Sequence, residues 1–211
     1  FARAREAFPC QYSLGFGLTE ASPLISSLSP GDHEGAPQEV ERRLRSCGRA
    51  VFNVEVRIVN EEGIEVSLGQ VGEIAVRGAN VMKGYWKMEE KTRQALRGGW
   101  LHTGDMARRD EEGYIFLVDR KKDVIKSGGE NIYSREVEEV MAAHPAVKEV
   151  AVVGVPDDRW GEAVKAVVVL REGADCSERE VLEFCRGKLA AFKRPKSATF
   201  LPSLPKNITG K

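Results

Sequence analysis

Residues 119–131 read Asp-Arg-Lys-Lys-Asp-Val-Ile-Lys-Ser-Gly-Gly-Glu-Asn, and the rest of the chain is organised around them. Short β-strands and turns are predicted before this stretch, and alternating helices and strands are predicted after it. Its density of charge and glycine indicates a surface link, although the glycines would also let a ligand approach the backbone closely. On its own, the stretch is as typical of a solvated linker between two domains as of a segment that binds a ligand.

The composition is that of a globular protein with one or two domains, because 42% of the 211 residues are hydrophobic and 30% are charged. Lys plus Arg and Asp plus Glu number 32 each, and this balance gives no reason to expect a nucleic-acid partner. No segment approaches the roughly 18 apolar residues of a membrane span. The chain begins without Met and in mid-pattern, which we interpret as a truncated or processed start.

The cysteines and histidines are too scattered to form a recognisable site. The four cysteines lie far apart with no Cys-x-x-Cys pair, so we expect a reduced, cytoplasmic protein. The three histidines give no support for a zinc cluster. Cys185 falls on the apolar face of a predicted helix and is assigned to the core.

Near the start, Gly15 and Gly17 flank Phe16 in a predicted strand that runs into a loop. The two glycines would leave the aromatic ring accessible from either side. Thr19 and Glu20 then offer a hydroxyl and a carboxylate side by side, a pair that can hold a phosphate oxygen and a hard cation such as Mg²⁺. The alternative, a polar turn with a buried Phe, is the commoner arrangement for such a sequence.

Residues 48–118 are predicted to form short strands, with one helix over about 89–96, and their regular turns favour a small barrel or sandwich. Strands are expected at 54–59 and 72–78, and a hairpin over 106–118. Asp105 follows Thr-Gly at the expected start of a strand, where its carboxylate could accept two hydroxyls of a ribose. A capping Asp in a turn is an equally good interpretation.

After the central stretch, the sequence predicts a small α+β domain. Ser134 is expected to cap a helix, and Ser177 with Glu180 forms a capping box at the start of another. Strands are predicted at 147–155, 163–170 and 198–201.

Five motifs in fixed order resemble successive signatures of the adenylate-forming superfamily, and the resemblance covers essentially the whole chain. They are Phe-Gly-Leu-Thr-Glu (16–20), Gly-Glu-Ile-Ala-Val-Arg-Gly running on to Gly-Tyr-Trp (72–86), Trp-Leu-His-Thr-Gly-Asp (100–105), Asp-Arg-Lys-Lys-Asp-Val-Ile-Lys-Ser-Gly-Gly (119–129) and Pro-Lys-Asn-Ile-Thr-Gly-Lys (205–211). Ser-Gly-Gly-Glu-Asn-Ile-Tyr (127–133) looks most like the fatty and other carboxylic acid–CoA ligases.

The resemblance implies the roles of five nucleotide-side residues. In this family ATP and a carboxylate form an acyl-adenylate and pyrophosphate, and the acyl group then passes to a thiol. Phe16 would stack on adenine, Thr19 would contact the α-phosphate, and Glu20 would ligate Mg²⁺. Asp105 would take the ribose hydroxyls, and Arg120 would also reach the ribose.

The remaining implied roles belong to the C-terminal domain, which in this family rotates between the two half-reactions. Lys211 would bridge the attacking carboxylate and the α-phosphate, because a fixed ammonium stabilises the developing negative charge. Lys122 would be the hinge. After rotation, the face with Lys126, Gly128 and Gly129 would replace Lys211, and the glycines would let the pantetheine arm of CoA pass.

The implied fold is α/β and β: the C-terminal portion of a large AMP-binding domain, including a small β-barrel subdomain, followed by a small α+β domain. We assign residues 1–45 to a remnant of the AMP-binding sheet, 46–120 to the β-rich subdomain and 121–211 to the mobile domain. The family's Ser/Thr/Gly-rich phosphate-binding loop has no counterpart in the sequence. We therefore expect the missing N-terminal region of the same protein as a partner, an inactive fragment without it, and residues 1–45 poorly packed, rearranged or paired with another chain.

Two other functions stay open at this point. One is a non-catalytic regulatory or interaction module that keeps the fold without the chemistry. The other is an adenylation domain that feeds a carrier protein instead of CoA. The sequence names neither the carboxylic acid nor the oligomeric state.

Overall fold

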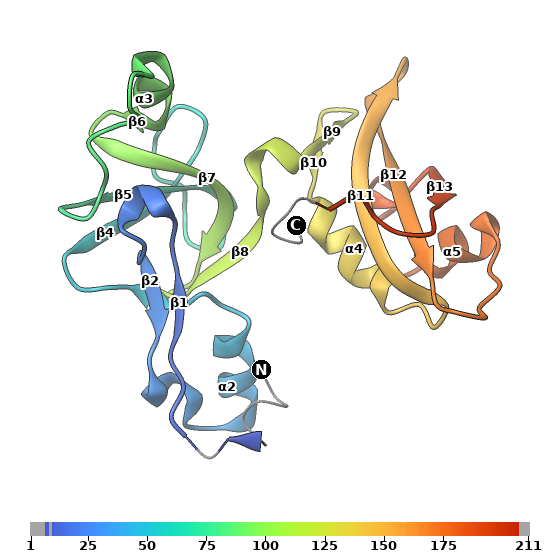
Figure 1. The fold of residues 1–211 in the computed structure, drawn as a ribbon, viewed down its shortest axis with the longest axis horizontal. Coiled ribbons are helices and arrows are strands. Elements are labelled where there is room, and N and C mark those ends of the chain that lie inside the picture. Colours follow the sequence, from blue (N-terminus) through green and yellow to red (C-terminus); the bar gives the residue numbers. More distant parts are fainter. Residues whose placement is uncertain (1–6, 9, 207–211) are drawn as a thin grey trace. The chain divides into compact units, whose positions relative to one another are not determined.

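The structure is a computed structural model, and it describes residues 7–8 and 10–206. It divides into two compact units, residues 1–118 and residues 119–211, each with its own core (Figure 1). Within the described residues, no helix is long and apolar enough to cross a membrane. All four cysteines are free thiols.

The first unit begins with a three-stranded antiparallel sheet in the order β1-β2-β3. Its strands are β1 (Leu14–Phe16), β2 (Ser26–Leu28) and β3 (Arg49–Ala50), and the connections hold the 3₁₀ turns η1 (Thr19–Ala21) and η2 (Pro30–His33) and the helix α2 (Pro37–Leu44). Ala21, Ile25 and Leu28 are completely buried in this region. Of the three alternatives expected for residues 1–45, poor packing is therefore wrong for residues 14–28, because these apolar side chains pack into the unit's own cores.

The second sheet of this unit has five strands in the order β4-β5-β7-β6, with β8 paired to β7. The bounds are β4 (Val54–Val59), β5 (Gly72–Gly78), α3 (Glu89–Ala95), β6 (Leu96–Arg97), β7 (Trp100–Arg109) and β8 (Ile115–Arg120). Apolar side chains that point to one face form the core, among them Ile58, Ile74, Val76 and Leu101. The strand expected from residue 106 in fact begins at Trp100, because Leu101 and His102 already pair with β5.

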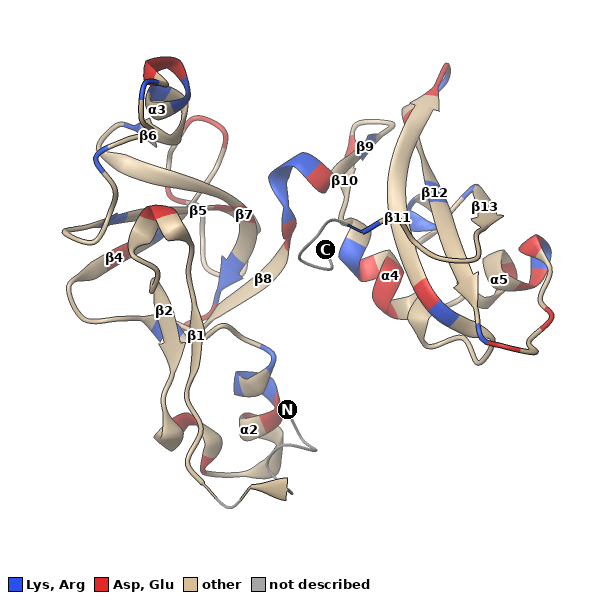
Figure 2. Cartoon of the chain, in the orientation of Figure 1, with Lys and Arg blue, Asp and Glu red and all other residues tan. Residues whose placement is uncertain are grey.

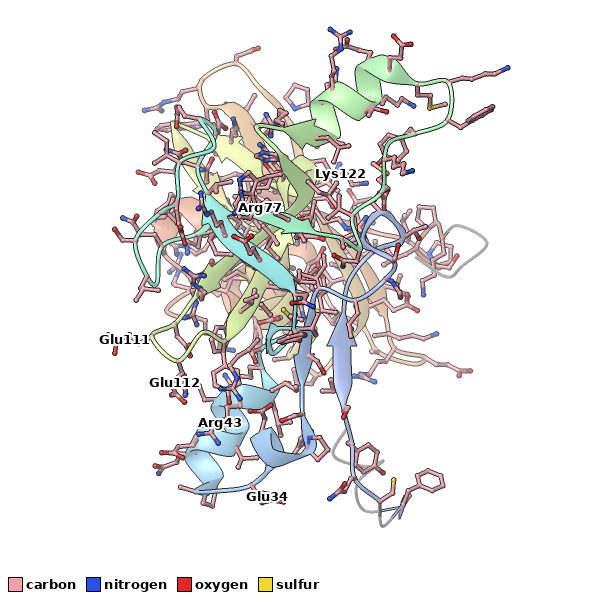
Figure 3. All side chains as sticks on the ribbon, turned by 90° about the vertical axis from the view of Figure 1, so that its left-hand side faces the viewer. Glu34, Arg43, Arg77, Glu111, Glu112 and Lys122 are labelled. Atoms are coloured by element: carbon pink, nitrogen blue, oxygen red, sulfur yellow. The ribbon has the colours of Figure 1, made fainter. Side chains whose placement is uncertain are left out.

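Ion pairs fasten α2 to the turn between β7 and β8. Arg42 bonds Asp110 and Glu112, and Arg43 lies 3.6 Å from Glu112. Figure 3 labels Arg43 and Glu112 on these two elements. The buried Tyr114 ring lies beneath this contact, and its hydroxyl donates to Asp32 at 2.5 Å.

The second unit is a five-stranded sheet with two helices. Its order is β10-β9-β12-β11, and β13 runs parallel to β12. The elements are η3 (Lys121–Asp123), β9 (Ile125–Ser127), β10 (Glu130–Ile132), α4 (Ser134–Ala142), β11 (Val147–Asp157), β12 (Gly161–Leu170), α5 (Glu178–Phe184), η4 (Ala191–Lys193) and β13 (Ser197–Phe200). Cys185 is fully buried in the core, as predicted, and the capping box of Ser177 and Glu180 opens α5.

The start of α4 differs from the prediction. Tyr133, not Ser134, occupies the N-cap position, and it makes no side-chain cap. Asp119 supplies the missing acceptor, because its Oδ2 accepts from the Ser134 hydroxyl at 3.0 Å and from the Arg135 backbone N–H at 3.4 Å. A carboxylate at a helix N-terminus stabilises the exposed N–H groups there. The first residue of the organising stretch is therefore a helix cap.

Candidate functional site

Phe16 ends β1 and lies half-buried against the first unit's core. The turn after it needs glycine at position 17, because a Cβ atom there would lie 1.5 Å from the Pro23 carbonyl oxygen. The Ile25 N–H donates to the Phe16 carbonyl at 2.8 Å and closes the hairpin. The Phe16 ring is thus partly covered on its core side. Its exposure is intermediate between the two predictions, an accessible ring and a buried ring.

The loop after Phe16 holds Thr19 and Glu20 in the 3₁₀ turn η1. Thr19 is exposed, and the Tyr85 hydroxyl donates to Glu20 Oε1 at 2.8 Å. Burial, followed by this hydrogen bond and the charge of Glu20, raises the pKa of Tyr85, so its proton stays on the hydroxyl at neutral pH. The Tyr85 hydroxyl therefore holds one oxygen of the Glu20 carboxylate in place.

Asn80 and Met82 hold the same loop through its backbone. The Asn80 amide donates to the Ala21 carbonyl at 2.8 Å and to the Leu24 carbonyl at 3.1 Å. The Met82 N–H donates to the Glu20 carbonyl at 2.8 Å. The segment after β5 thus fixes both the backbone and the side chain of the η1 loop.

Asp105 lies in a bulge in the middle of β7, not at the start of a strand as predicted. Glu73 pairs with Met106 and Ala75 pairs with His102, so residues 103–105 of β7 face Ile74 alone. Gly104 takes a left-handed φ of +77°, which favours glycine. Bulges next to functional sites re-aim a side chain. Here the bulge displaces Asp105 from the regular ladder.

Phe16 and the bulge that holds Asp105 both border the core of the first unit. Phe16 pairs with Ser26, whose hydroxyl donates to the Cys47 carbonyl at 2.7 Å. Burial raises the pKa of the Cys47 thiol, and the charge of Asp105 raises it further. Phe16 packs against the core that contains Ile74, and residues 103–105 face Ile74, so the proposed adenine and ribose contacts border the same core.

In the second unit, the predicted site residues that the structure describes are exposed and lie at strand ends, in a short strand and in turns. Arg120 ends β8, and Lys122 lies in η3; both side chains are exposed. Figure 2 shows the basic run that these residues form, and Figure 3 labels Lys122. The hinge role of Lys122 and the ribose contact of Arg120 stay predictions.

Gly128 and Gly129 form the two-residue turn between β9 and β10, with φ of +61° and +86°. Two left-handed residues are typical of a tight hairpin turn. A Cβ atom on Gly128 would lie 2.8 Å from the Trp160 ring, whereas one on Gly129 would meet nothing within 4 Å. The Gly128 N–H donates to the Trp160 carbonyl at 2.8 Å. The exposed Lys126 precedes the turn, and its N–H donates to Glu162 at 2.6 Å.

Lys211 lies outside the described residues, so its role stays a prediction. Sequence reasoning missed the residues that hold the site: Glu73, Asn80, Tyr85 and Trp160. For Glu73, Asn80 and Tyr85 the available signal was their place within residues 72–86, which the second motif spans, whereas Trp160 lies outside the quoted motifs.

The residues present fit a magnesium ion that is shared with phosphates. Mg²⁺ in such sites takes one or two carboxylates, and substrate phosphates and water supply the other oxygens. Glu20, oriented through Tyr85, would supply one such carboxylate. Among the described residues, no three His, Cys, Asp or Glu side chains gather into a metal site made of protein alone.

Comparison with known proteins identifies the family. The model of the AMP-binding enzyme matches residues 1–86, and that of the AMP-binding enzyme C-terminal domain matches residues 136–211. A medium/long-chain-fatty-acid–CoA ligase of Mycobacterium tuberculosis is 42% identical over 217 residues, covering 100% of this chain and 37% of the relative. A feruloyl-CoA synthase of an Amycolatopsis species is 45% identical over 197 residues, covering 93% of this chain and 39% of the relative.

Solved structures agree. The o-succinylbenzoate–CoA synthetase of Bacillus subtilis, in complex with its acyl-adenylate intermediate, matches with a TM-score of 0.86 and 36% identity, covering 100% of this chain and 41% of that one. The same enzyme is known with ATP and a magnesium ion. The chain thus spans about two fifths of the length of these relatives. Together the two family models and these acid–CoA ligase relatives show that the chain belongs to the adenylate-forming superfamily of AMP-binding enzymes.

Proposed function

We propose that the chain is part of an ATP-dependent acid–CoA ligase, and that it supplies one side of the nucleotide site and the mobile C-terminal domain. The observation that carries the proposal is that Phe16 packs against the core that contains Ile74, and that the β7 bulge with Asp105 faces the same Ile74. An aromatic ring and the carboxylate proposed to bind ribose therefore border one core. The relatives that are named as acid–CoA ligases support the same reaction class.

In the first half-reaction, a carboxylate oxygen attacks the α-phosphorus of ATP, and the bond to pyrophosphate breaks. Phe16 stacks on adenine, Asp105 accepts the ribose hydroxyls, and Thr19 contacts the α-phosphate. Glu20 would hold a magnesium ion, which when bound neutralises phosphate charge. Lys211 offsets the negative charge that develops where the carboxylate meets the phosphate.

In the second half-reaction, the CoA sulfur attacks the acyl carbonyl, and AMP leaves. The C-terminal domain turns about Lys122 and presents Lys126 and the Gly128–Gly129 turn. Glycines without side chains leave room for the pantetheine arm beside the backbone. A hinge with two positions lets one site run two reactions.

The test uses the natural protein that carries this sequence, a panel of fatty and aromatic acids, and two thiols, CoA and a pantetheinyl carrier protein. Release of AMP and pyrophosphate that depends on acid and on CoA supports the proposal. Release that depends on the carrier alone would assign an adenylation domain instead. No acid-dependent release with any substrate would favour a non-catalytic module.

For the 211-residue chain by itself, we expect no adenylation, because its sequence holds no Ser/Thr/Gly-rich phosphate loop. Acid-dependent ATP–pyrophosphate exchange, measured on the purified chain, checks this. Exchange above the rate without acid would contradict it.

A further inference from the structure

Glu73 is a charged side chain in the interior of the first unit. It lies in β5 between Gly72 and Ile74, and the residue is 4% exposed. Burying a carboxylate is unfavourable unless hydrogen bonds and charges compensate it. No motif role assigned above uses Glu73, so its burial calls for a structural explanation.

The side chain of Glu73 has partners before and inside the β7 bulge. Its Oε1 accepts from the Gly104 N–H at 3.0 Å, inside the bulge. Its Oε2 lies 3.2 Å from His102 Nδ1, just before the bulge, and 3.4 Å from Arg97 Nη2. The carboxylate therefore bridges regular strand and bulge.

A second residue fixes the bulge from the inside. The Thr103 hydroxyl donates to the Ile74 carbonyl at 3.0 Å and accepts from the Asp105 N–H at 3.1 Å. Gly104, between them, sits in a left-handed conformation and gives its N–H to Glu73. The backbone that leads into the Asp105 Cα is thus held by two side-chain contacts.

We propose that Glu73 is the positioning residue for the ribose-binding carboxylate: it holds the three-residue bulge in the one conformation that aims Asp105 at the ribose hydroxyls. The inference rests on the proposed function for the role of Asp105. It adds a buried residue that touches no substrate and acts through the backbone of Gly104.

The experiment measures ribose discrimination in the natural protein, as the ratio of kcat/KM for ATP to kcat/KM for 2′-deoxy-ATP and for 3′-deoxy-ATP. The lowest ratio is expected for Asp105→Ala, which lacks the carboxylate. Glu73→Ala is expected to lower the ratio toward the Asp105→Ala value, by on the order of 10-fold to 100-fold, the range for hydrogen bonds to a charged group. Glu73→Gln keeps an oxygen for the Gly104 N–H and should recover part of the ratio.

Asp32→Ala is the matched control. Asp32 is also 4% exposed in the same unit, and it accepts from the Tyr114 hydroxyl and the Ser29 N–H. Its loss should lower thermal stability and leave the ratio unchanged. If Asp32→Ala and Glu73→Ala lower the ratio alike, Glu73 is a general stabilising residue and the inference is overturned.

A second readout needs no activity. In the 211-residue chain, hydrogen exchange of the Gly104 amide should accelerate at least about tenfold in Glu73→Ala relative to amides elsewhere in β7, and less in Glu73→Gln, which keeps an acceptor oxygen. Unchanged Gly104 exchange in Glu73→Ala would show that Glu73 does not hold the bulge. If Gly104 exchange accelerates but Asp105→Ala leaves the ribose ratio intact, then the role of Asp105 in the proposed function is what fails, and the positioning role of Glu73 fails with it.

Discussion

Asp105 and Gly128 both lie where a pair of β-strands is interrupted, yet the two interruptions are held in different ways. Asp105 follows Gly104, whose N–H is bonded to a carboxylate that is almost fully buried. Gly128 lies in a solvent-exposed turn, and its main neighbour is Trp160, which is 43% exposed. The proposed nucleotide contact is therefore fixed from the interior. The turn proposed to face the thiol is held at the surface, where the Gly128 N–H bonds the Trp160 carbonyl and the Trp160 ring lies beside Gly128.

The largest expected effect separates the half-reactions. Lys211→Ala in the natural protein should reduce adenylation by about 10²–10³-fold, because it removes a preorganised cation from the developing charge. Thioester formation from a supplied acyl-adenylate should be retained. Pyrophosphate exchange and thioester formation, assayed separately, check this. An equal loss in both assays would refute the division of roles.

Next come the two glycines of the hairpin, which form a matched pair. Each alanine variant bears the left-handed backbone cost of about 1–2 kcal/mol. Gly128→Ala also forces a Cβ to 2.8 Å from the Trp160 ring, whereas Gly129→Ala meets nothing. We expect Gly128→Ala to be less stable than Gly129→Ala by about 1–3 kcal/mol. Urea unfolding of the 211-residue chain measures the difference. Equal stability of the two variants would show that the ring does not constrain the turn.

A smaller effect is expected at the magnesium ligand. Tyr85→Phe removes the donor to Glu20 Oε1 and keeps the ring. Loss of such an orienting contact weakens metal affinity by about tenfold. Mn²⁺ binding in the presence of ATP, followed by electron paramagnetic resonance, should show this shift in the natural protein. Tyr12→Phe serves as a control, because its hydroxyl donates to the Phe8 carbonyl in another part of the unit. An unchanged Mn²⁺ affinity in Tyr85→Phe would show that Tyr85 does not orient the proposed metal ligand Glu20.

Much of the fold follows from local pattern. The strand at 72–78, the helix near 89–96 and the capping box at Ser177 all reflect neighbours within a few residues, so the sequence predicts them. The contacts that hold the site join distant residues. Tyr85 reaches Glu20 across 65 positions, and Glu73 reaches Gly104 across 31.

Corrections to the sequence analysis have the same physical origin. The cap of α4 comes from Asp119, which is 15 positions before Ser134. Asp105 lies in the middle of β7 and not at its start, because Leu101 and His102 already pair with β5. Side-chain contacts between residues this far apart produce no periodic pattern in the sequence. A charged residue in a strand is therefore predicted to be exposed unless its partner is known. The candidate residues could be named from the motifs, whereas the residues that position them could not.

The smallest effect is a pH dependence in the second unit. Burial, with smaller contributions from the charges of Asp119 and Asp123, raises the pKa of Glu138 above its ordinary value of 4.5, against the lowering effect of the Val152 N–H. The folded state therefore binds this proton more tightly than the unfolded state. The resulting stability is full below pH 4.5 and is lost as pH rises through the folded pKa.

Glu138→Gln keeps an acceptor oxygen and cannot ionise. It should raise the melting temperature at pH 7 relative to the unsubstituted chain, and the gain should vanish near pH 4. Thermal unfolding at the two pH values measures it. Glu139→Gln is the control, because that side chain is exposed and pairs with Arg135. A gain of equal size at pH 4 and pH 7 would contradict the assignment.

The most direct test of the central claim, that the two units carry different halves of one reaction, is acid-dependent ATP–pyrophosphate exchange in Asp105→Ala and Gly128→Ala, side by side in the natural protein. We predict that Gly128→Ala exchanges at the rate of the unsubstituted protein while its thioester formation is slowed. Asp105→Ala should lose exchange by on the order of 10-fold to 100-fold at limiting ATP. Equal loss of exchange in the two variants would contradict the account.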